Sequence, residues 1–398
     1  MRKKKKEYIL LQKIIFTSYV FTIYMLGTNI PLYGVDISKF IENNVNLDSF
    51  LIHTIGGDLN QCSIFNLGVF PYMISSLLVQ IIYAFKSQEA KKRIFVKKRN
   101  SLTLIITLII SCIQAFVHLG SLSFIREIDI LGYLMVFWEM VAGSMVIVFL
   151  CSRNKKYGLG GQSIIILANI LSSIVISMNG VPIKKITIPL ILSVFIVVII
   201  ILMENTEFRI PLQRISIHNI YADKNYLAIK FNPIGVMPVM FTSAFFLLPQ
   251  IMVKLALYFK PDSRVLLWWQ EQLSLTKVMG IIVYLIILFL LTVSFSLLFI
   301  NPKDITEQFL KSGDSFLDIH MGNDTRKYLK YVMLSISTFS AVIMGLCLGI
   351  PLYLQYIGRM EGILNILPSS TMMLTGVICS FIREMKAIND LESYKSFI

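Results

Sequence analysis

Residues Ser63 to Gln80 read SIFNLGVFPYMISSLLVQ, and this stretch decides the fold class. It contains no charged side chain, and the apolar run continues to residue 85. A helix needs about 20 mainly apolar residues to cross the hydrocarbon core of a bilayer. The segment 63–85 is therefore predicted to span a membrane.

Runs of the same kind recur along the whole chain. Of its 398 residues, 56% are hydrophobic and only 15% are charged, and the mean hydropathy is +0.72. A soluble protein of this size needs a far more polar surface. The chain is therefore expected to be an all-α polytopic membrane protein of about ten transmembrane helices. The other spans are predicted near 11–33, 101–122, 131–151, 160–180, 186–203, 234–259, 277–300, 329–355 and 362–382.

The basic residues predict which ends of the spans face the cytoplasm. The N-terminus, the segments after every second span and the C-terminus hold 28 of the 37 Lys and Arg residues. Lys and Arg are enriched in cytoplasmic loops. Both termini are therefore expected in the cytoplasm, with Lys184 and Lys185 as the exception on the opposite face.

Counting spans divides the chain into two halves. Five spans in each would give two units of inverted topology, an arrangement common in transport proteins. The N-terminal half is expected to cover 1–180 and the C-terminal half 181–398. The second half would carry cytoplasmic loops at 204–230 and 301–328, each too short to house an enzyme active site.

One segment does not fit a simple span. Residues 50–62 read FLIHTIGGDLNQC, which is apolar at first, breaks at Gly56–Gly57 and is too short to cross. Irregular backbone at membrane depth survives only when it is packed in protein or lines a wet cavity. The segment therefore either implies a cavity inside the bundle or lies at the outer surface.

The charges and polar residues exclude several classes of function. The net charge of +14 is accounted for by topology signals and contacts with anionic lipids, so no nucleic acid partner is expected. The dense basic segment 86–100 leaves open the docking of an acidic cytosolic partner or a ribosome. The five Cys and four His residues show no metal-ligand spacing, and no Walker-type or Ser/His/Asp pattern occurs. Neither a cofactor nor catalysis is expected.

Several blocks resemble, in order, the motifs of the SecY/Sec61-alpha family of protein-conducting channels. The stretch from Ser63 to Gln80 is similar to the family's second span, usually close to SIFALGIMPYIxASIIIQ. Each of the other blocks is a weak match alone, but six in one order cover nearly the whole chain. They are NIPLYGVD (29–36), AGSMVIVFLCSRNKKYGLGGQSIII (142–166), RIPLQ (209–213), NPIGVMPVMFTSAF (232–245) and FINPKDITEQFLKSGDSFLDIHMGNDTRKYL (299–329).

Departures from the family pattern point to a subgroup. The loop tip that usually reads GIRPG is Asp318 to Gly322 here, so His320 replaces the arginine. The glutamate of the LGEQIT block is replaced near Ser152–Arg153, and the chain ends soon after the predicted tenth span. These features resemble the accessory SecY paralogue of Gram-positive cocci. That resemblance implies export of serine-rich glycosylated adhesins across the plasma membrane, a SecA-type ATPase motor and small SecE/SecG-like membrane subunits.

The resemblance also assigns roles to residues. A channel for polypeptides is expected to have a narrow ring of apolar side chains, where ions lose their hydration. Residues 50–62 become a plug below that ring, and the second and seventh spans form a lateral gate that opens toward lipid. The ring residues are Val69, Met73, Ile166, Met240 and Leu374, with Met373 nearly as good a match as Leu374. The plug residues are Phe50, Ile52, Ile55, Gly56 and Gly57, and the gate residues are Ser75, Ser76, Gln80, Thr242 and Ser243.

Without catalytic machinery of its own, the channel needs an external source of energy. The loops 204–230 and 301–328 are the expected docking surface for a motor that drives a secretory preprotein through the pore. The candidate contacts are Arg209, Arg214, Lys311, His320, Arg326 and Lys327. The rival interpretation is a secondary transporter or lipid-linked sugar flippase, for which Glu139, a carboxylate inside a predicted span, is the main support.

Overall fold

The computed structural model describes most of the chain. The described residues are 2–35, 63–84, 96–120, 122, 124, 129–178, 182–214, 225–260, 263–317, 319–358, 364 and 366–394.

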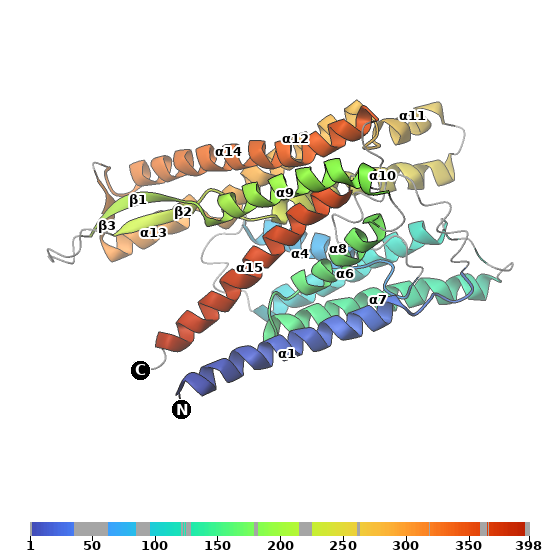
Figure 1. The fold of residues 1–398 in the computed structure, drawn as a ribbon, viewed down its shortest axis with the longest axis horizontal. Coiled ribbons are helices and arrows are strands. Elements are labelled where there is room, and N and C mark those ends of the chain that lie inside the picture. The colour runs from blue at the N-terminus through green and yellow to red at the C-terminus, as the bar shows by residue number, and fades with distance from the viewer. Residues whose placement is uncertain are drawn as a thin grey trace.

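Each of the ten predicted spans coincides with a helix, and Figure 1 shows these helices running mostly along the long axis of the molecule. Helices dominate the described part of the chain. They are α1 (Arg2–Thr28), α4 (Phe70–Ala84), α6 (Val96–Leu119), α7 (Ile130–Tyr157), α8 (Ser163–Met178), α9 (Ile183–Asn205), α10 (Met237–Phe259), α12 (Val278–Phe299), α14 (Asn323–Tyr356) and α15 (Ile366–Tyr394).

Seven stretches of helix in the described part of the chain are long and apolar enough to cross a membrane. They belong to α1, α6, α7, α9, α10, α12 and α14. The helices α4 and α8 are apolar but shorter, with 15 and 16 residues. The prediction of a mostly helical membrane protein is confirmed.

The helix α4 begins at Phe70, seven residues later than the span predicted from residue 63. The preceding segment turns tightly instead, with backbone hydrogen bonds from Asn66 to Ser63 and from Gly68 to Phe65. Gly68 has a φ of 57°, a conformation that glycine adopts at little cost. An isolated bridge between Pro31 and Ser63 ties this segment to the chain after α1.

A small antiparallel sheet lies at one end of the molecule. It has the order β2-β1-β3 and is built from β1 (Glu207–Arg214), β2 (Tyr226–Lys230) and β3 (Asp314–Phe316). With α13 (Pro302–Ser312) and the start of α14 it encloses its own core, in which Ile210, Ile229 and Phe316 are buried. The prediction of an all-α fold thus holds for the spans but leaves out this sheet, which we call the end sheet.

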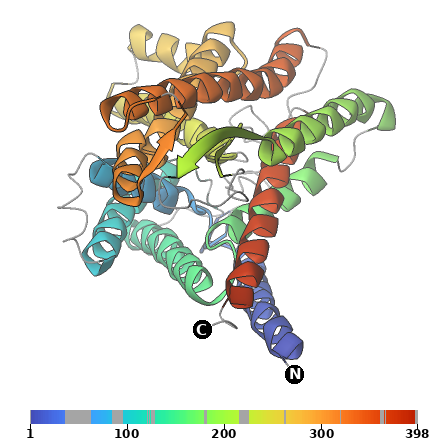
Figure 2. The same cartoon turned by 90° about the vertical axis from the view of Figure 1, so that its left-hand side faces the viewer.

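The two ends of the molecule differ. Figure 1 shows both termini at the end that carries the end sheet, and Figure 2 shows that end facing the viewer. At the opposite end the short helix α11 (Arg264–Gln272) joins α10 to α12. The Gln250 side chain of α10 donates a hydrogen bond to the Leu273 carbonyl at 2.7 Å, which fixes the chain after α11 against α10.

Candidate functional site

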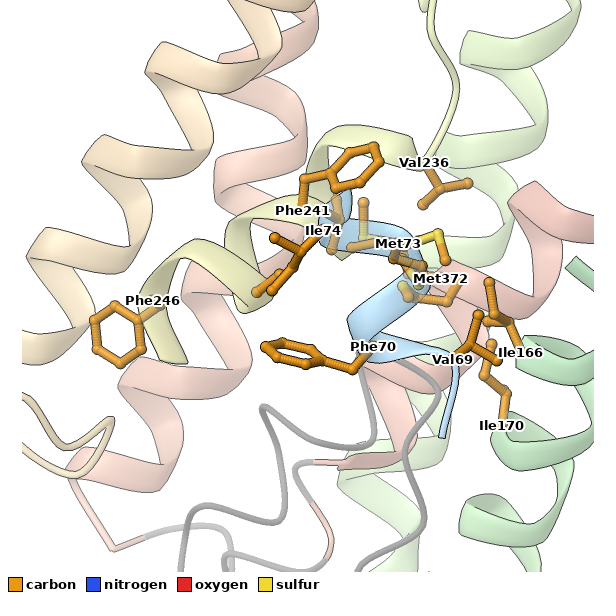
Figure 3. Packing of buried hydrophobic residues seen from close by; sticks show 14 of the residues in the cluster. Val69, Phe70, Met73, Ile74, Ile166, Ile170, Val236, Phe241, Phe246 and Met372 are labelled. Atoms are coloured by element: carbon orange, nitrogen blue, oxygen red, sulfur yellow. The ribbon is translucent and has the colours of Figure 1, made fainter. Parts of the chain in front are cut away.

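The predicted ring residues come together in the largest buried cluster. Val69 just before α4, Met73 of α4, Ile166 of α8 and Met240 of α10 all belong to it, and each is at most 6% exposed. Figure 3 shows Val69, Met73 and Ile166 packed in this cluster. We call these four side chains, together with the buried residues packed on them, the waist.

The helix α15 also contributes to the waist, but not mainly through the predicted residue. Met372 and Met373 are fully buried, whereas Leu374 is only partly buried and packs against the cluster. Figure 3 shows Met372 next to Met73. Met372 is therefore a waist residue that the sequence motifs did not identify, because no strong motif anchors the alignment of α15.

The chemistry of the waist is uniform. It is built from Val, Ile and Met side chains of α4, α8, α10 and α15 and of the turn before α4. An ion that enters a narrow apolar passage loses its hydration without gaining polar ligands, which is the physical basis of a hydrophobic gate. Methionine is unbranched and adapts to irregular shapes, so this cluster can pack around side chains of different sizes.

The polar residues of the predicted gate form hydrogen bonds within each side of the gate. The Ser75 hydroxyl of α4 pairs with that of Thr107 on α6 at 2.6 Å. The Ser243 hydroxyl of α10 lies 3.2 Å from the Tyr284 hydroxyl of α12. Ser76 and Thr242 donate to carbonyls of their own helices, and Gln80 is exposed. The hydrogen bonds therefore join α4 to α6 and α10 to α12.

Contact between α4 and α10 themselves is made by apolar side chains. The two helices touch, and Ile74 of α4 and Phe241 of α10 belong to the same buried cluster. Figure 3 shows both of them in this cluster. Apolar contacts are non-directional, and lipid tails are as apolar as these side chains. Apolar packing therefore holds the boundary between α4 and α10.

The predicted docking residues gather around the end sheet. Arg209 lies on β1 with its guanidinium 4.7 Å from the ring centre of Tyr226, and the backbone of Arg214 pairs with Asp314. Lys311 is exposed in the last turn of α13. His320 is exposed in the turn before α14, and Arg326 and Lys327 are exposed in its first turns, where Lys327 lies 3.9 Å from Asp324.

A buried ion pair that the sequence did not predict lies where the end sheet meets the spans. Glu204, at the end of α9, has a side chain with no exposed surface and pairs with Arg383 of α15. Its other carboxylate oxygen accepts a hydrogen bond from the Asn232 amide at 3.0 Å. The pair thus joins α15 to α9 and to the start of the α10 region.

The residues on either side of Arg383 in α15 contact the turn between α7 and α8. The Glu384 carboxylate accepts a hydrogen bond from the backbone N–H of Gly160 at 2.8 Å. The ring of Phe381 lies so close to Gly160 that a β-carbon there would be 2.3 Å from it. We call Phe381, Arg383 and Glu384 the α15 clasp, because they bind the turn between α7 and α8 on one side and the end of α9 on the other.

The turn between α7 and α8 is itself held by side chains. The Asn154 amide donates to the carbonyls of Leu159 and Gly161 at 2.8 and 2.9 Å. The backbone N–H of Leu159 donates to the Thr17 hydroxyl of α1 at 2.8 Å. The glycine-rich stretch 158–161 thus forms the turn between α7 and α8.

Glu139, the main support for a transporter, has a structural partner. Its carboxylate accepts a hydrogen bond from the backbone N–H of Tyr33 at 3.1 Å, which ties α7 to the turn after α1. In the described part of the chain, no group of three or more His, Cys, Asp or Glu residues could hold a metal ion. The predicted plug residues 50–62 lie outside the described residues.

Comparison with known proteins identifies the family. The SecY family model matches residues 63–382. The protein named "Accessory Sec system protein translocase subunit SecY2" from Leuconostoc gelidum subsp. gasicomitatum is 28% identical, covering 98% of this chain and 97% of the relative. The protein of the same name from Streptococcus sanguinis is 25% identical over 98% of each chain.

Solved structures agree with the fold. A structure described as that of a protein conducting channel has a TM-score of 0.70 and 16% identity, covering 96% of this chain and 93% of the other. A structure from work on the plug domain of the SecY protein has a TM-score of 0.67 at the same identity and coverage. The family model spans most of the chain, and the fold agrees with it. The chain belongs to the SecY family.

Proposed function

We propose that this chain is the pore-forming subunit of a Sec-type preprotein translocase in the plasma membrane and passes unfolded polypeptides through the waist. The observation that carries the proposal is the convergence of Val69, Met73, Ile166 and Met240 in one buried apolar cluster. These residues come from three separate family motifs and meet only in the folded chain. The channel is passive, so ATP hydrolysis falls to a separate motor.

The proposed topology has ten spans in two inverted halves, 1–180 and 181–398, with both termini in the cytoplasm. The ten helices that coincide with the predicted spans and the Lys and Arg distribution support it. The termini and the end sheet lie at the same end of the molecule, as this topology requires (Figure 1). The short helices α4 and α8 would span the membrane together with the irregular segments beside them.

The plug and gate assignments rest on the family resemblance. Residues 50–62 would close the pore on its outer side, and α4 and α10 would form the lateral gate. The apolar contact between α4 and α10 supports the gate, because the hydrogen bonds of Ser75 and Ser243 would survive its opening. Gln80, exposed on α4, would meet an incoming signal segment.

We assign the chain to the accessory form of the translocase. The SecY2 names of its relatives and the replacement of the loop-tip arginine by His320 support this assignment. The cargo would be serine-rich glycosylated adhesins, and the motor a SecA-type ATPase. Small SecE/SecG-like subunits and anionic lipids would surround the spans.

A site-specific crosslink tests whether the waist is the polypeptide path. A photo-crosslinking amino acid at Met73 or Met240 is expected to capture a stalled secretory preprotein. Met240 is 6% exposed, whereas Met252 on the same helix is 69% exposed. The same crosslinker at Met252 is therefore expected to capture lipid, and it serves as the matched control.

The outcome that contradicts the proposal is equally specific. If the preprotein crosslinks to Met252 but not to Met73 or Met240, the polypeptide passes outside the waist. If crosslinkers at Met73 and Met240 capture only small solutes and no preprotein, the transporter interpretation is favoured instead.

Charge reversal tests the docking surface. Lys311→Glu combined with Arg326→Glu is expected to weaken binding of the SecA-type motor by about tenfold, because both exposed cations lie beside the end sheet and like charges repel. The effect should shrink as salt is added, since exposed charges are screened. Binding of the purified motor to the channel in lipid nanodiscs measures it.

Lys260→Glu is the control for that experiment. Lys260 is also exposed but follows α10 at the end opposite the end sheet (Figure 1). Motor binding should not respond to this change. Equal weakening by both variants would mean that net charge, rather than the end sheet, attracts the motor.

A further inference from the structure

An apolar pocket lies between three helices at the end opposite the end sheet. Its volume is about 790 Å³, within the range of pockets that bind small ligands. Its walls include Phe116 from α6, Gly120 just after it, Tyr133 and Phe137 from α7, and Leu255 and Tyr258 from α10. The pocket is separate from the waist, because none of its lining residues belongs to the waist.

The lining selects an apolar ligand. Among the described residues that line the pocket none carries a charge, and only Tyr133 and Tyr258 carry a side-chain hydroxyl. Apolar cavities of this kind stay free of ordered water and take up apolar molecules instead. An unfilled pocket would forfeit dispersion contacts along all its walls.

Several residues that line the pocket are exposed on the surface of candidate spans. Phe116 is 53% exposed, Leu134 is 53% exposed and Ile130 is 83% exposed, and all three lie at the ends of candidate membrane spans. With the spans placed across a bilayer as proposed above, these exposed side chains face its hydrocarbon core. An apolar molecule that enters sideways comes from the bilayer.

The size of the pocket separates a lipid chain from a peptide helix. A helix with its side chains is 10–12 Å across and rises 5.4 Å per turn, so one turn occupies roughly 500 Å³. The pocket therefore holds fewer than two turns. An acyl chain is narrow, flexible and free of polar groups, so it can follow the space between the aromatic rings.

We propose that this pocket binds one acyl chain of a membrane phospholipid. Edge-to-face contacts between Phe124 and Tyr133, at 5.0 Å, and between Phe116 and Tyr258, at 6.5 Å, frame the site. The second contact crosses from α6 to α10, so the bound chain touches a helix of each half. The assignment concerns the idle protein and does not depend on the proposed passage of polypeptides.

A photoactivatable lipid tests the proposal directly. The full chain is placed in nanodiscs of phosphatidylglycerol with a small fraction carrying a diazirine on one acyl chain, without motor or preprotein. After illumination, mass spectrometry of peptides is expected to find labels concentrated on the pocket-lining parts of α6, α7 and α10. Free fatty acid with the same diazirine is the competing probe and is expected to label these peptides no more strongly than the phospholipid.

A pocket-filling variant distinguishes this site from the general lipid shell. A β-carbon at Gly120 would meet only one backbone oxygen, at 3.6 Å, so Gly120→Phe can occupy the pocket without strain at its own position. Labelling of the lining peptides is expected to fall by about tenfold, the factor that corresponds to ~1.4 kcal/mol of lost binding. Gly345→Phe is the matched control, because a β-carbon there meets nothing within 4 Å and Gly345 lies on α14, away from the pocket.

Three results would overturn the proposal. Labels spread over all lipid-facing helices, unchanged in Gly120→Phe, would show an ordinary lipid shell. Preferential labelling by the free fatty acid would assign the pocket to another ligand. Capture of a stalled preprotein by a crosslinker at Leu134 would assign the pocket to the polypeptide path.

Equal melting temperatures of Gly120→Phe and Gly345→Phe would exclude misfolding as the cause of reduced labelling. Leu134→Trp provides a second way to fill the pocket.

Discussion

Replacing Arg383 with alanine is expected to destabilise the protein by about 3 kcal/mol and to lower its melting temperature in detergent or nanodiscs. Glu204 has no exposed side-chain surface, so its carboxylate would be left buried with the Asn232 amide as a hydrogen-bond partner and Lys230 as the remaining nearby cation. Removal of one partner from a buried ion pair typically costs 3–5 kcal/mol. We expect the lower end of this range, because the Arg383 side chain is 35% exposed and water can enter the space that the alanine variant leaves.

The double variant Glu204→Gln/Arg383→Gln separates charge from packing. It removes both charges and keeps an oxygen that can accept from Asn232. Replacing both charges of a buried pair is often close to neutral, so we expect the double variant to be more stable than Arg383→Gln alone. Lys386→Ala, an exposed position on the same helix, is the control. If Lys386→Ala and Arg383→Ala have equal effects, the ion pair contributes nothing to stability.

Gly143→Ala is expected to be the second severe change, with a cost of about 1–3 kcal/mol or more and impaired transport. A β-carbon at Gly143 of α7 would lie 2.0 Å from the backbone oxygen of Ile64. The Ile64 segment cannot move away freely, because its backbone N–H donates to Ile30 at 3.0 Å. The clash would displace the turn that leads into α4 and with it the waist residues Val69 and Met73.

Gly345→Ala provides the comparison for this prediction. A β-carbon at Gly345 of α14 meets nothing within 4 Å. Alanine favours a helix over glycine by about 0.5–1 kcal/mol, so this variant should be neutral or more stable. Thermal unfolding and preprotein transport measured on both variants decide the matter. Equal stability of the two variants would mean that α7 can shift away from Ile64.

The spans were predictable because hydropathy is a local property. The run from 63 to 85 and its counterparts each carry enough apolar residues to identify themselves. The start of α4 was not predictable in this way, because the turn at Gly68 is as apolar as the helix that follows. The waist residues could be inferred only through the family motifs, since buried Val, Ile and Met look the same in any core. Met372 was missed where those motifs are weakest.

The end sheet and the buried ion pair show two different limits of sequence reasoning. Buried and exposed side chains alternate along β2, where Leu227 and Ile229 face the core of the sheet, and Ile210 and Leu212 do the same on β1. The sequence therefore carries the two-residue hydrophobic period of a strand, but over too few residues to predict one. Glu204 and Arg383 gave no such signal. Each looks like a charge at the edge of a span, and only the fold brings them together.

The α15 clasp has a consequence for biosynthesis. Among the described helices α15 is made last, and its residues 381–384 complete contacts with the turn at Gly160 and with Glu204. Until this part of the chain has left the ribosome, the contacts of the clasp with the α7–α8 turn and with the end of α9 cannot form. A nascent channel is therefore expected to gain this connection only after residues 381–384 have been made. A chain that stops before Arg383 would leave the Glu204 carboxylate without this cation.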